Sequence, residues 1–189
     1  MSRQFWTEQL SWATADGTAI ATTATETIIF PNVTIPANYM QDGRTLVINA
    51  SGRWSNVITA APTLTFALRW GGVSGTVLTQ SPALWTPTTA TANAQWFLKI
   101  LVQTRSNGAT GTVFSQGIVT MTEDVGVGAS FGVAAVSQTF LMGSAGLATP
   151  AAVTVDLTAD TALSLTAKWS ASDASNSLTG HIYTIQSLN

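Results

Sequence analysis

Charge is the property that this sequence has least of. Charged residues make up 8% of its 189 positions, against about 25% in a typical soluble domain. The formal net charge of −2 provides no basic face of the kind that binds nucleic acid, so we expect no nucleic-acid partner. A surface with so few charges is poorly protected against association. We therefore expect a protein that packs against copies of itself; the alternative is an unusually neutral soluble protein.

Cysteine is absent as well, which excludes disulfides and thiolate metal sites. No stretch approaches the roughly 18 consecutive apolar residues of a membrane-spanning helix. Polar residues interrupt the first ten positions, unlike the apolar core of a signal peptide. We expect neither a membrane partner nor a secretion signal.

Runs of alternating apolar and polar residues recur along the chain, separated by turn residues. This period of two is typical of strands with one buried face, and no run predicts a helix of three turns. In the run 94–105, Phe97 and Leu101 flank Lys99 on the second face, which indicates a central, nearly two-sided strand. About nine or ten strands with long crossing loops predict an all-β antiparallel jelly-roll sandwich, with an immunoglobulin-like sandwich as the alternative.

The domain organisation follows from the irregular start of the chain. We expect an N-terminal arm over residues 1–26 and a single jelly-roll domain over residues 27–189. The arm carries Phe5, Trp6, Leu10 and Trp12, which are too apolar to remain in water. They either pack back over their own domain or dock on a partner, where aromatic side chains dominate binding energy.

The C-terminal run 178–188 has apolar residues on both faces. Leu178, Ile182 and Leu188 fall on one face, and Tyr183 and Ile185 fall on the other. A strand of this kind needs cover on both sides. We expect one face to pack on the domain's own core, and His181, Tyr183 and Ile185 to form a subunit interface.

The sequence contains no recognisable catalytic, cofactor or metal motif. His181 is the single histidine and has no acidic residue within five positions. The pairs Glu123–Asp124 and Asp156 with Asp160 match no calcium-loop spacing. The glycine-rich stretch 126–132 precedes no helix, which a dinucleotide site would require. We expect no enzyme activity, no cofactor and no metal, although distant acids of a glycosidase are not visible in a sequence.

The tryptophans raise a carbohydrate hypothesis, because jelly rolls host lectins. Trp54, Trp70 and Trp96 lie in phase with Leu and Ile, which predicts that they belong to the core. Trp85 lies in a loop and is free to stack on a sugar, on a neighbour or on its own domain.

Several packing and turn motifs resemble those of small structural proteins of tailed bacteriophages. The similarity touches most of the chain except residues 123–150. The segments that carry it are 5–12 with Asp16-Gly17-Thr18, Phe30-Pro31, 35–40 with Gly43-Arg44, 64–66 with 69–72, 162–167, 181–183 and 187–189.

This resemblance implies a virion component assembled in the host cytoplasm, with a jelly roll of the tumour-necrosis-factor and C1q type. It implies a homotrimeric capsid decoration (cement) protein whose partners are itself and the major capsid protein or another virion protein. The arm residues would dock on the shell, and each copy would clamp several shell subunits. The alternative is a tail or head fibre module that binds a host-surface glycan through Trp85.

Overall fold

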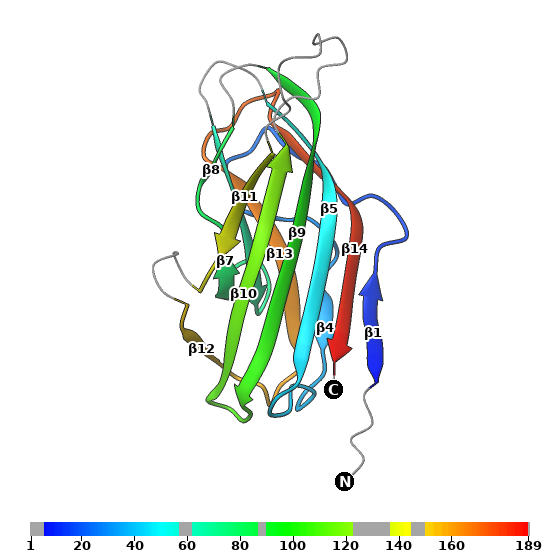
Figure 1. The fold of residues 1–189 in the computed structure, drawn as a ribbon, viewed down its shortest axis with the longest axis vertical. Coiled ribbons are helices and arrows are strands. Elements are labelled where there is room, and N and C mark those ends of the chain that lie inside the picture. Colours follow the sequence, from blue (N-terminus) through cyan, green and yellow to red (C-terminus); the bar gives the residue numbers. More distant parts are fainter. Residues whose placement is uncertain (1–5, 57–61, 87–89, 123–136, 145–149, 189) are drawn as a thin grey trace.

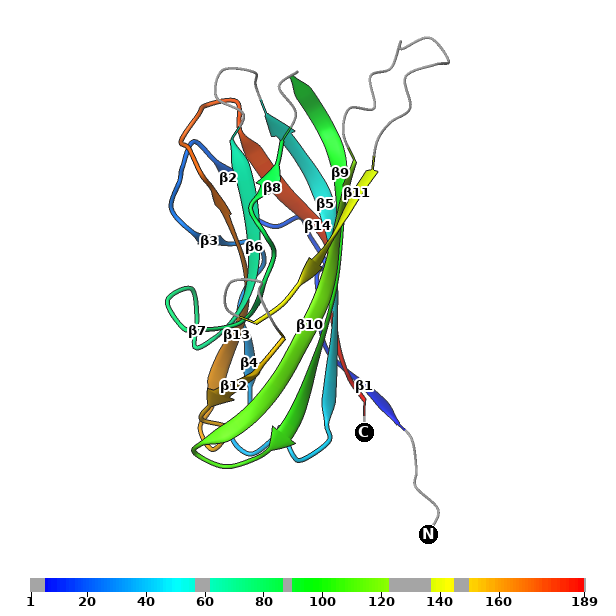
Figure 2. The same ribbon diagram turned by 60° about the vertical axis from the view of Figure 1, so that its left-hand side comes forward.

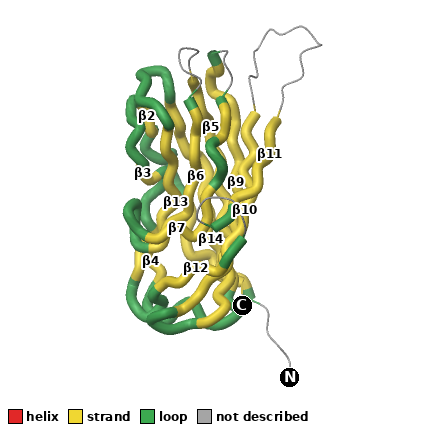
Figure 3. Tube along the Cα trace, turned by 90° about the vertical axis from the view of Figure 1, so that its left-hand side faces the viewer, coloured by secondary structure: helices red, strands yellow, loops and turns green. Residues whose placement is uncertain are grey.

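The computed structural model describes residues 6–56, 62–86, 90–122, 137–144 and 150–188, apart from the side chain of Trp85. Within these ranges the secondary structure consists of β-strands and contains no helix, as the tube in Figure 3 shows. The strands form two antiparallel sheets that pack as two layers (Figures 1 and 2).

The larger sheet has eight strands in the order β1-β14-β5-β9-β10-β11, with β2 beside β14 and β12 beside β10. Its strands are β1 (Thr7–Trp12), β2 (Ile20–Ala21), β5 (Thr45–Asn56), β9 (Thr91–Ser106), β10 (Gly111–Thr122), β11 (Ser137–Met142), β12 (Ala152–Val155) and β14 (Ser177–Leu188).

The smaller sheet has six strands in the order β3-β13-β6-β7, with β4 beside β13 and β8 beside β6. Its strands are β3 (Thr27–Ile28), β4 (Val33–Ile35), β6 (Thr63–Trp70), β7 (Thr76–Gln80), β8 (Leu84–Trp85) and β13 (Thr161–Trp169).

The chain passes back and forth between the two sheets. It leaves the large sheet after β5, builds β6 and β7 in the small one, and returns for β9 and β10. It then crosses again for β13 and ends in the large sheet with β14. Antiparallel strands that alternate between two layers are the mark of a jelly roll, so the predicted fold class is confirmed. The strands outnumber the nine or ten expected, because pieces as short as β2 and β3 have no periodic pattern of their own.

The core lies between the sheets. It is built from the alternate residues of each strand that point toward the opposite sheet. In β9 the alternation of buried and exposed side chains is regular almost throughout. Trp54, Trp70 and Trp96 are buried, which confirms their predicted place in the core. The Trp96 ring packs against Phe66 from the opposite sheet, with the ring centroids 5.0 Å apart.

Strand β14 contains a β-bulge at His181, which changes the interpretation of the C-terminal run. Gly180 pairs with Gly52 and Ile182 pairs with Ser51, so His181 is an extra residue in the ladder. The buried face of the strand therefore uses even-numbered residues before the bulge and odd-numbered residues after it. The apolar residues that strict alternation would place on two faces mostly lie on one.

The bulge makes the predicted subunit interface wrong for two of its three residues. Tyr183 is 3% exposed and Ile185 is 0% exposed, so both belong to the chain's own core and cannot contact another subunit. The Tyr183 ring stacks on Phe30, with centroids 4.6 Å apart and ring planes 5° apart. Burial raises the pKa of Tyr183 well above its ordinary value. The outward-facing apolar residues of this half of β14 are Ile182 and Leu188.

The N-terminal segment runs along the edge of β14 that faces away from β5. Strand β1 pairs with it from Thr7 opposite Leu188 to Trp12 opposite Thr184, and the two strands lie side by side in Figure 1. The pairing continues beyond β1, where the backbone N–H of Gly17 donates to the carbonyl of Gly180 at 2.8 Å. Residues 7–21 thus cover the edge of the large sheet.

A candidate protein-docking face

The outer face of the large sheet exposes large apolar side chains on five of its strands. We call this surface the apolar face. Its most exposed members are Leu141 at 77%, Ile182 at 60% and Trp12 at 59%. The complete set is Trp12 of β1, Phe97 and Leu101 of β9, Ile118 of β10, Leu141 of β11, and Ile182 and Leu188 of β14. Contiguous exposed apolar surface on a folded domain marks a site of interaction.

Strand register places these side chains in cross-strand rows. One row runs from Trp12 through Thr184, Asn49, Lys99 and Ile118 to Leu141, and so crosses six neighbouring strands. Directly opposed side chains on one face of a sheet lie about 5 Å apart. The row is therefore a continuous strip, with apolar groups at both ends and the Lys99 amine in the middle.

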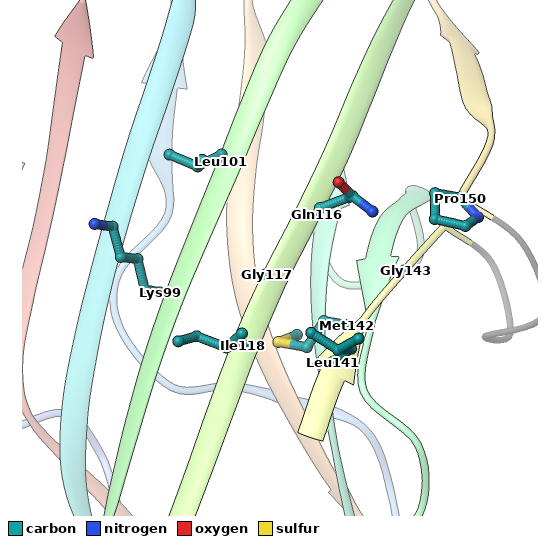
Figure 4. A pocket seen from close by; sticks show the side chains of 9 residues that line it. All are labelled: Lys99, Leu101, Gln116, Gly117, Ile118, Leu141, Met142, Gly143 and Pro150. Carbon is teal, nitrogen blue, oxygen red and sulfur yellow. The ribbon is translucent and has the colours of Figure 1, made fainter. Parts of the chain in front are cut away.

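A groove of about 550 Å³ lies between β9, β10 and β11 on this face (Figure 4). Leu101, Ile118 and Leu141 supply apolar walls, and the Lys99 side chain lies beside them. Met142, Gly143 and Pro150 line the far side, where the chain leaves β11. The groove is therefore mainly apolar and contains one cationic group.

A second hollow of about 590 Å³ lies across the same face, between β9 and β14. Phe97 and Ile182 provide its apolar surface, and Arg53 and His181 lie at its border. Each hollow thus combines exposed apolar side chains with a basic residue.

The predicted arm residues that the structure describes differ in their surroundings. Phe5 lies outside the described residues. Trp6 and Trp12 are exposed, whereas Leu10 is partly buried and packs against the core. Only Trp12 of the predicted set has a defined place on the apolar face. Near the start of the same strand, Glu8 accepts a hydrogen bond from the hydroxyl of Tyr39 at 2.6 Å, which joins the edge strand to the domain.

His181 lies at the bulge and is partly exposed, and its place in a subunit interface remains a prediction. Its Nδ1 is 2.7 Å from Oδ1 of Asp16, a separation at which the ring N–H donates to the carboxylate. The side chain of Trp85, the residue named for glycan contact, lies outside the described part of the structure. Glycan contact through Trp85 therefore stays a prediction.

The smaller sheet presents a polar outer face instead. A hollow of about 500 Å³ contains Glu26, Arg69 and Lys168. Arg69 donates to both carboxylate oxygens of Glu26, at 2.5 and 2.6 Å, and the Thr166 hydroxyl donates to one of them at 2.5 Å. Glu26 and Arg69 thus satisfy each other within the chain, which leaves Lys168 as the exposed charge of this hollow.

The acids considered as metal ligands serve as turn caps. Asp156 accepts hydrogen bonds from the N–H and hydroxyl of Thr158, and Asp160 accepts one from the N–H of Ala37. Among the described residues no three His, Asp or Glu side chains gather as a metal site. Glu123 and Asp124 lie outside those residues. No helix in the described ranges is long and apolar enough to cross a membrane.

Sequence reasoning found part of the apolar face and missed the rest. Phe97 and Leu101 were visible as apolar residues on the second face of a central strand. Ile118 and Leu141 carried no such signal, because each lies in a run where an apolar residue is ordinary. Only the strand order, which brings β11 against β10, places them beside Lys99.

Comparisons with known proteins add little. No protein-family model matches the chain, and no curated protein matches it significantly. Among solved structures, the chain is similar to the CBM2 module of the evolved Dit of Lactobacillus casei BL23 phage J-1. The identity is 11%, the alignment covers 99% of this chain and 98% of that module, and the TM-score is 0.39. A TM-score this low does not establish a shared fold.

Proposed function

We propose that this chain is a non-enzymatic structural protein of a bacteriophage particle that binds another virion protein through its apolar face. The observation that carries the proposal is that face itself, with exposed large apolar side chains on five of six neighbouring strands. The resemblance of its turn and strand motifs to small phage structural proteins supports the biological setting. The low content of charge agrees with a surface that is covered in an assembly.

The form of this function that the resemblance favours is a decoration (cement) protein on the capsid shell, with the major capsid protein as its partner. A copy that contacts more than one shell subunit resists opening, because several interfaces must break together. Self-association into a trimer belongs to the same proposal. Tyr183 and Ile185 give it no support, because both are buried in the chain's own core.

Particles of the encoding phage test the proposal directly. We expect the wild-type protein to be present in purified particles, and Leu141→Glu to be incorporated at least about tenfold less, because it places a charge on the most exposed apolar position of the face. Val73→Glu is the matched control, since Val73 is exposed in the turn between β6 and β7, away from the apolar face. Absence from particles, or normal incorporation of Leu141→Glu, would contradict the proposal.

A glycan-binding module of a tail or head fibre is the second candidate. The observation that favours it is the exposure of two aromatic rings, Trp12 and Phe97, on one sheet face. A glycan array separates the two functions, because a cement protein has no sugar preference. A sugar-specific signal that Trp12→Ala or Phe97→Ala abolishes would select the glycan-binding function.

A further inference from the structure

Basic residues outnumber acidic ones on the apolar face, and the carboxylate at its edge, that of Asp16, is bound by the ring N–H of His181. The exposed basic residues of the face are Arg53, Lys99 and Arg105, and none of the three forms an ion pair with any other residue that the structure describes. Among the described strands of the large sheet the one acidic residue is Glu8, which points inward to Tyr39. The apolar face is therefore cationic as well as apolar.

The same combination of groups occurs twice. In the groove between β9, β10 and β11, Lys99 stands beside Leu101, Ile118 and Leu141. In the second hollow, Arg53 stands beside Phe97 and Ile182. A partner that fills these hollows with apolar side chains removes water from the neighbouring cations. Removing water from a cation makes the free energy of binding less favourable unless a carboxylate on the partner pairs with that cation.

The face is large enough for a stable protein interface. Its four long strands, β14, β5, β9 and β10, have 12, 12, 16 and 12 residues. The part in register across all four strands corresponds to residues 96–103 of β9. At about 3.4 Å per residue it is about 27 Å long, and with β1 and β11 at its sides it is about 29 Å wide at about 4.8 Å per strand. That area is close to the ~800 Å² that each partner contributes to an interface of standard size.

From these observations we infer that the apolar face docks a protein surface that presents apolar side chains flanked by carboxylates. This inference rests on the proposed function and names the chemistry of the partner. Burial of Ile118 and Leu141 supplies most of the affinity, and pairing of Lys99 and Arg53 with carboxylates supplies specificity and a faster association.

A second copy in a face-to-face contact fits less well. Lys99 lies in the middle of the six-strand row, so a twofold axis through the face brings two Lys99 side chains together. The acids nearest this face are already bound within the chain, Glu8 to Tyr39 and Asp16 to His181, and neither lies in the row that contains Lys99. Like charges opposed in a dehydrated contact are unfavourable, which favours a different, acidic partner surface.

Selection of random peptides displayed on ribosomes, against the immobilised full-length protein, tests the partner chemistry. We expect the selected pool to be enriched in Asp and Glu together with Leu, Ile, Phe or Trp. The same selection against Lys99→Glu should reduce the acidic enrichment and increase Lys and Arg. An unchanged preference on Lys99→Glu, or a pool with no acidic enrichment, would overturn the inference.

Point variants locate the binding. A selected peptide should bind Ile118→Ser and Leu141→Ser about tenfold more weakly than wild type, a loss of about 1.4 kcal/mol. It should bind Val73→Ser unchanged, since Val73 lies outside the face. Both face variants replace exposed side chains, so circular dichroism should show an intact fold. Equal binding by all the variants would overturn the inference.

Two further outcomes separate this inference from the proposed function. If sedimentation shows that the wild type self-associates and that Leu141→Ser abolishes this, the occupant is a second copy and the inference fails. If the selected peptides show no acidic enrichment while Leu141→Glu is still lost from particles, the proposed function is retained. The inference of an acidic partner surface is then rejected. Normal incorporation of Leu141→Glu contradicts the proposed function whatever the peptides show.

Discussion

Among single residues, Glu26 shows how a scarce charge is used in the structure. Burial of its carboxyl group raises its pKa, but hydrogen bonds from Arg69 and Thr166 and the charge of Arg69 outweigh this effect. The pKa of Glu26 therefore lies below its ordinary value of 4.5. The ionised carboxylate joins the start of β3 to β6 and β13, so the smaller sheet is held together partly by this group.

Replacement of Glu26 should cost stability in a pH-dependent way. Glu26→Gln should lower the free energy of unfolding at neutral pH by about 1–2 kcal/mol, because hydrogen bonds to a charged group are lost. Since the folded pKa is depressed, the contribution is complete above 4.5 and disappears as pH falls through the folded pKa. Urea unfolding of both proteins over a pH series should therefore converge at acidic pH.

A double-mutant cycle with Arg69→Met provides the control for this pair. The double variant should be less destabilised than the sum of the single variants at neutral pH. A stability difference between wild type and Glu26→Gln that is the same at every pH would contradict the ionic role.

Glycine is required where the bulge brings β14 close to its neighbours. A Cβ on Gly180 would lie 2.3 Å from the Phe30 ring, and one on Gly52 would lie 1.9 Å from the carbonyl oxygen of Thr179. Phe30 is buried and stacked on Tyr183, so its ring cannot move aside freely. Space for a side chain, rather than backbone flexibility, is what these two positions lack.

Gly180→Ala should therefore lower the free energy of unfolding by about 1–3 kcal/mol through overpacking. Gly143→Ala is the matched control, because no atom lies within 4 Å of the added methyl group and its φ is not positive. Urea denaturation of the two variants checks the prediction. Equal stability of Gly180→Ala and Gly143→Ala would show that the Phe30–Tyr183 stack adapts.

At the level of the element, β14 decides which side chains belong to the core. The bulge at His181 inserts one residue without moving its pairing partners, since Gly180 faces Gly52 and Ile182 faces Ser51, the next residue of β5. Deleting His181 therefore restores regular alternation and leaves Tyr183 and Ile185 pointing inward. Deleting a residue after the bulge shifts every later side chain to the opposite face.

Two single-residue deletions should thus differ sharply. The variant lacking His181 should still unfold cooperatively, with a modest loss of stability. The variant lacking Thr184 should turn Ile185 outward and Gln186 inward, which costs several kcal/mol through lost apolar burial and a buried amide. Thermal unfolding followed by near-ultraviolet circular dichroism distinguishes the two. Equal loss of tertiary structure in both would contradict the assigned register.

The edge strand β1 changes how a docking role for the N-terminus should be tested. Removing residues 1–14 would strip β1 from β14 and leave that edge unpaired, so lost binding would also report damaged folding. Trp12→Ser is cleaner, because the Trp12 side chain is exposed and its removal leaves the backbone pairing in place.

For the whole molecule, the topology determines how the chain must fold. Thr7 pairs with Leu188, and β5 lies between β9 and the distant β14. Such pairings close long loops before they gain contacts, and this slows folding. Refolding followed by tryptophan fluorescence should therefore take milliseconds to seconds, as buried Trp54, Trp96 and Trp169 report core formation. Complete refolding within microseconds would contradict this account.

Much of the architecture was predictable because it depends on local periodicity. The alternation in 94–105 and the apolar phase of Trp54, Trp70 and Trp96 each reflect one buried face per strand, which any single strand displays in its sequence. The absence of a helical pattern and the spacing of turns then led to the two-layer jelly roll. The short strands β2 and β3 left no pattern, because two residues have no period.

The site was less predictable, because it depends on which strands become neighbours. The sequence by itself determined that charge is scarce, that strands alternate, and that Phe97 and Leu101 flank Lys99 on a second face. Only the tertiary structure decided that Tyr183 and Ile185 are core and that Ile118 and Leu141 lie beside Lys99. The physical reason is that bulges and strand order arise from pairing between distant segments, which local periodicity does not encode.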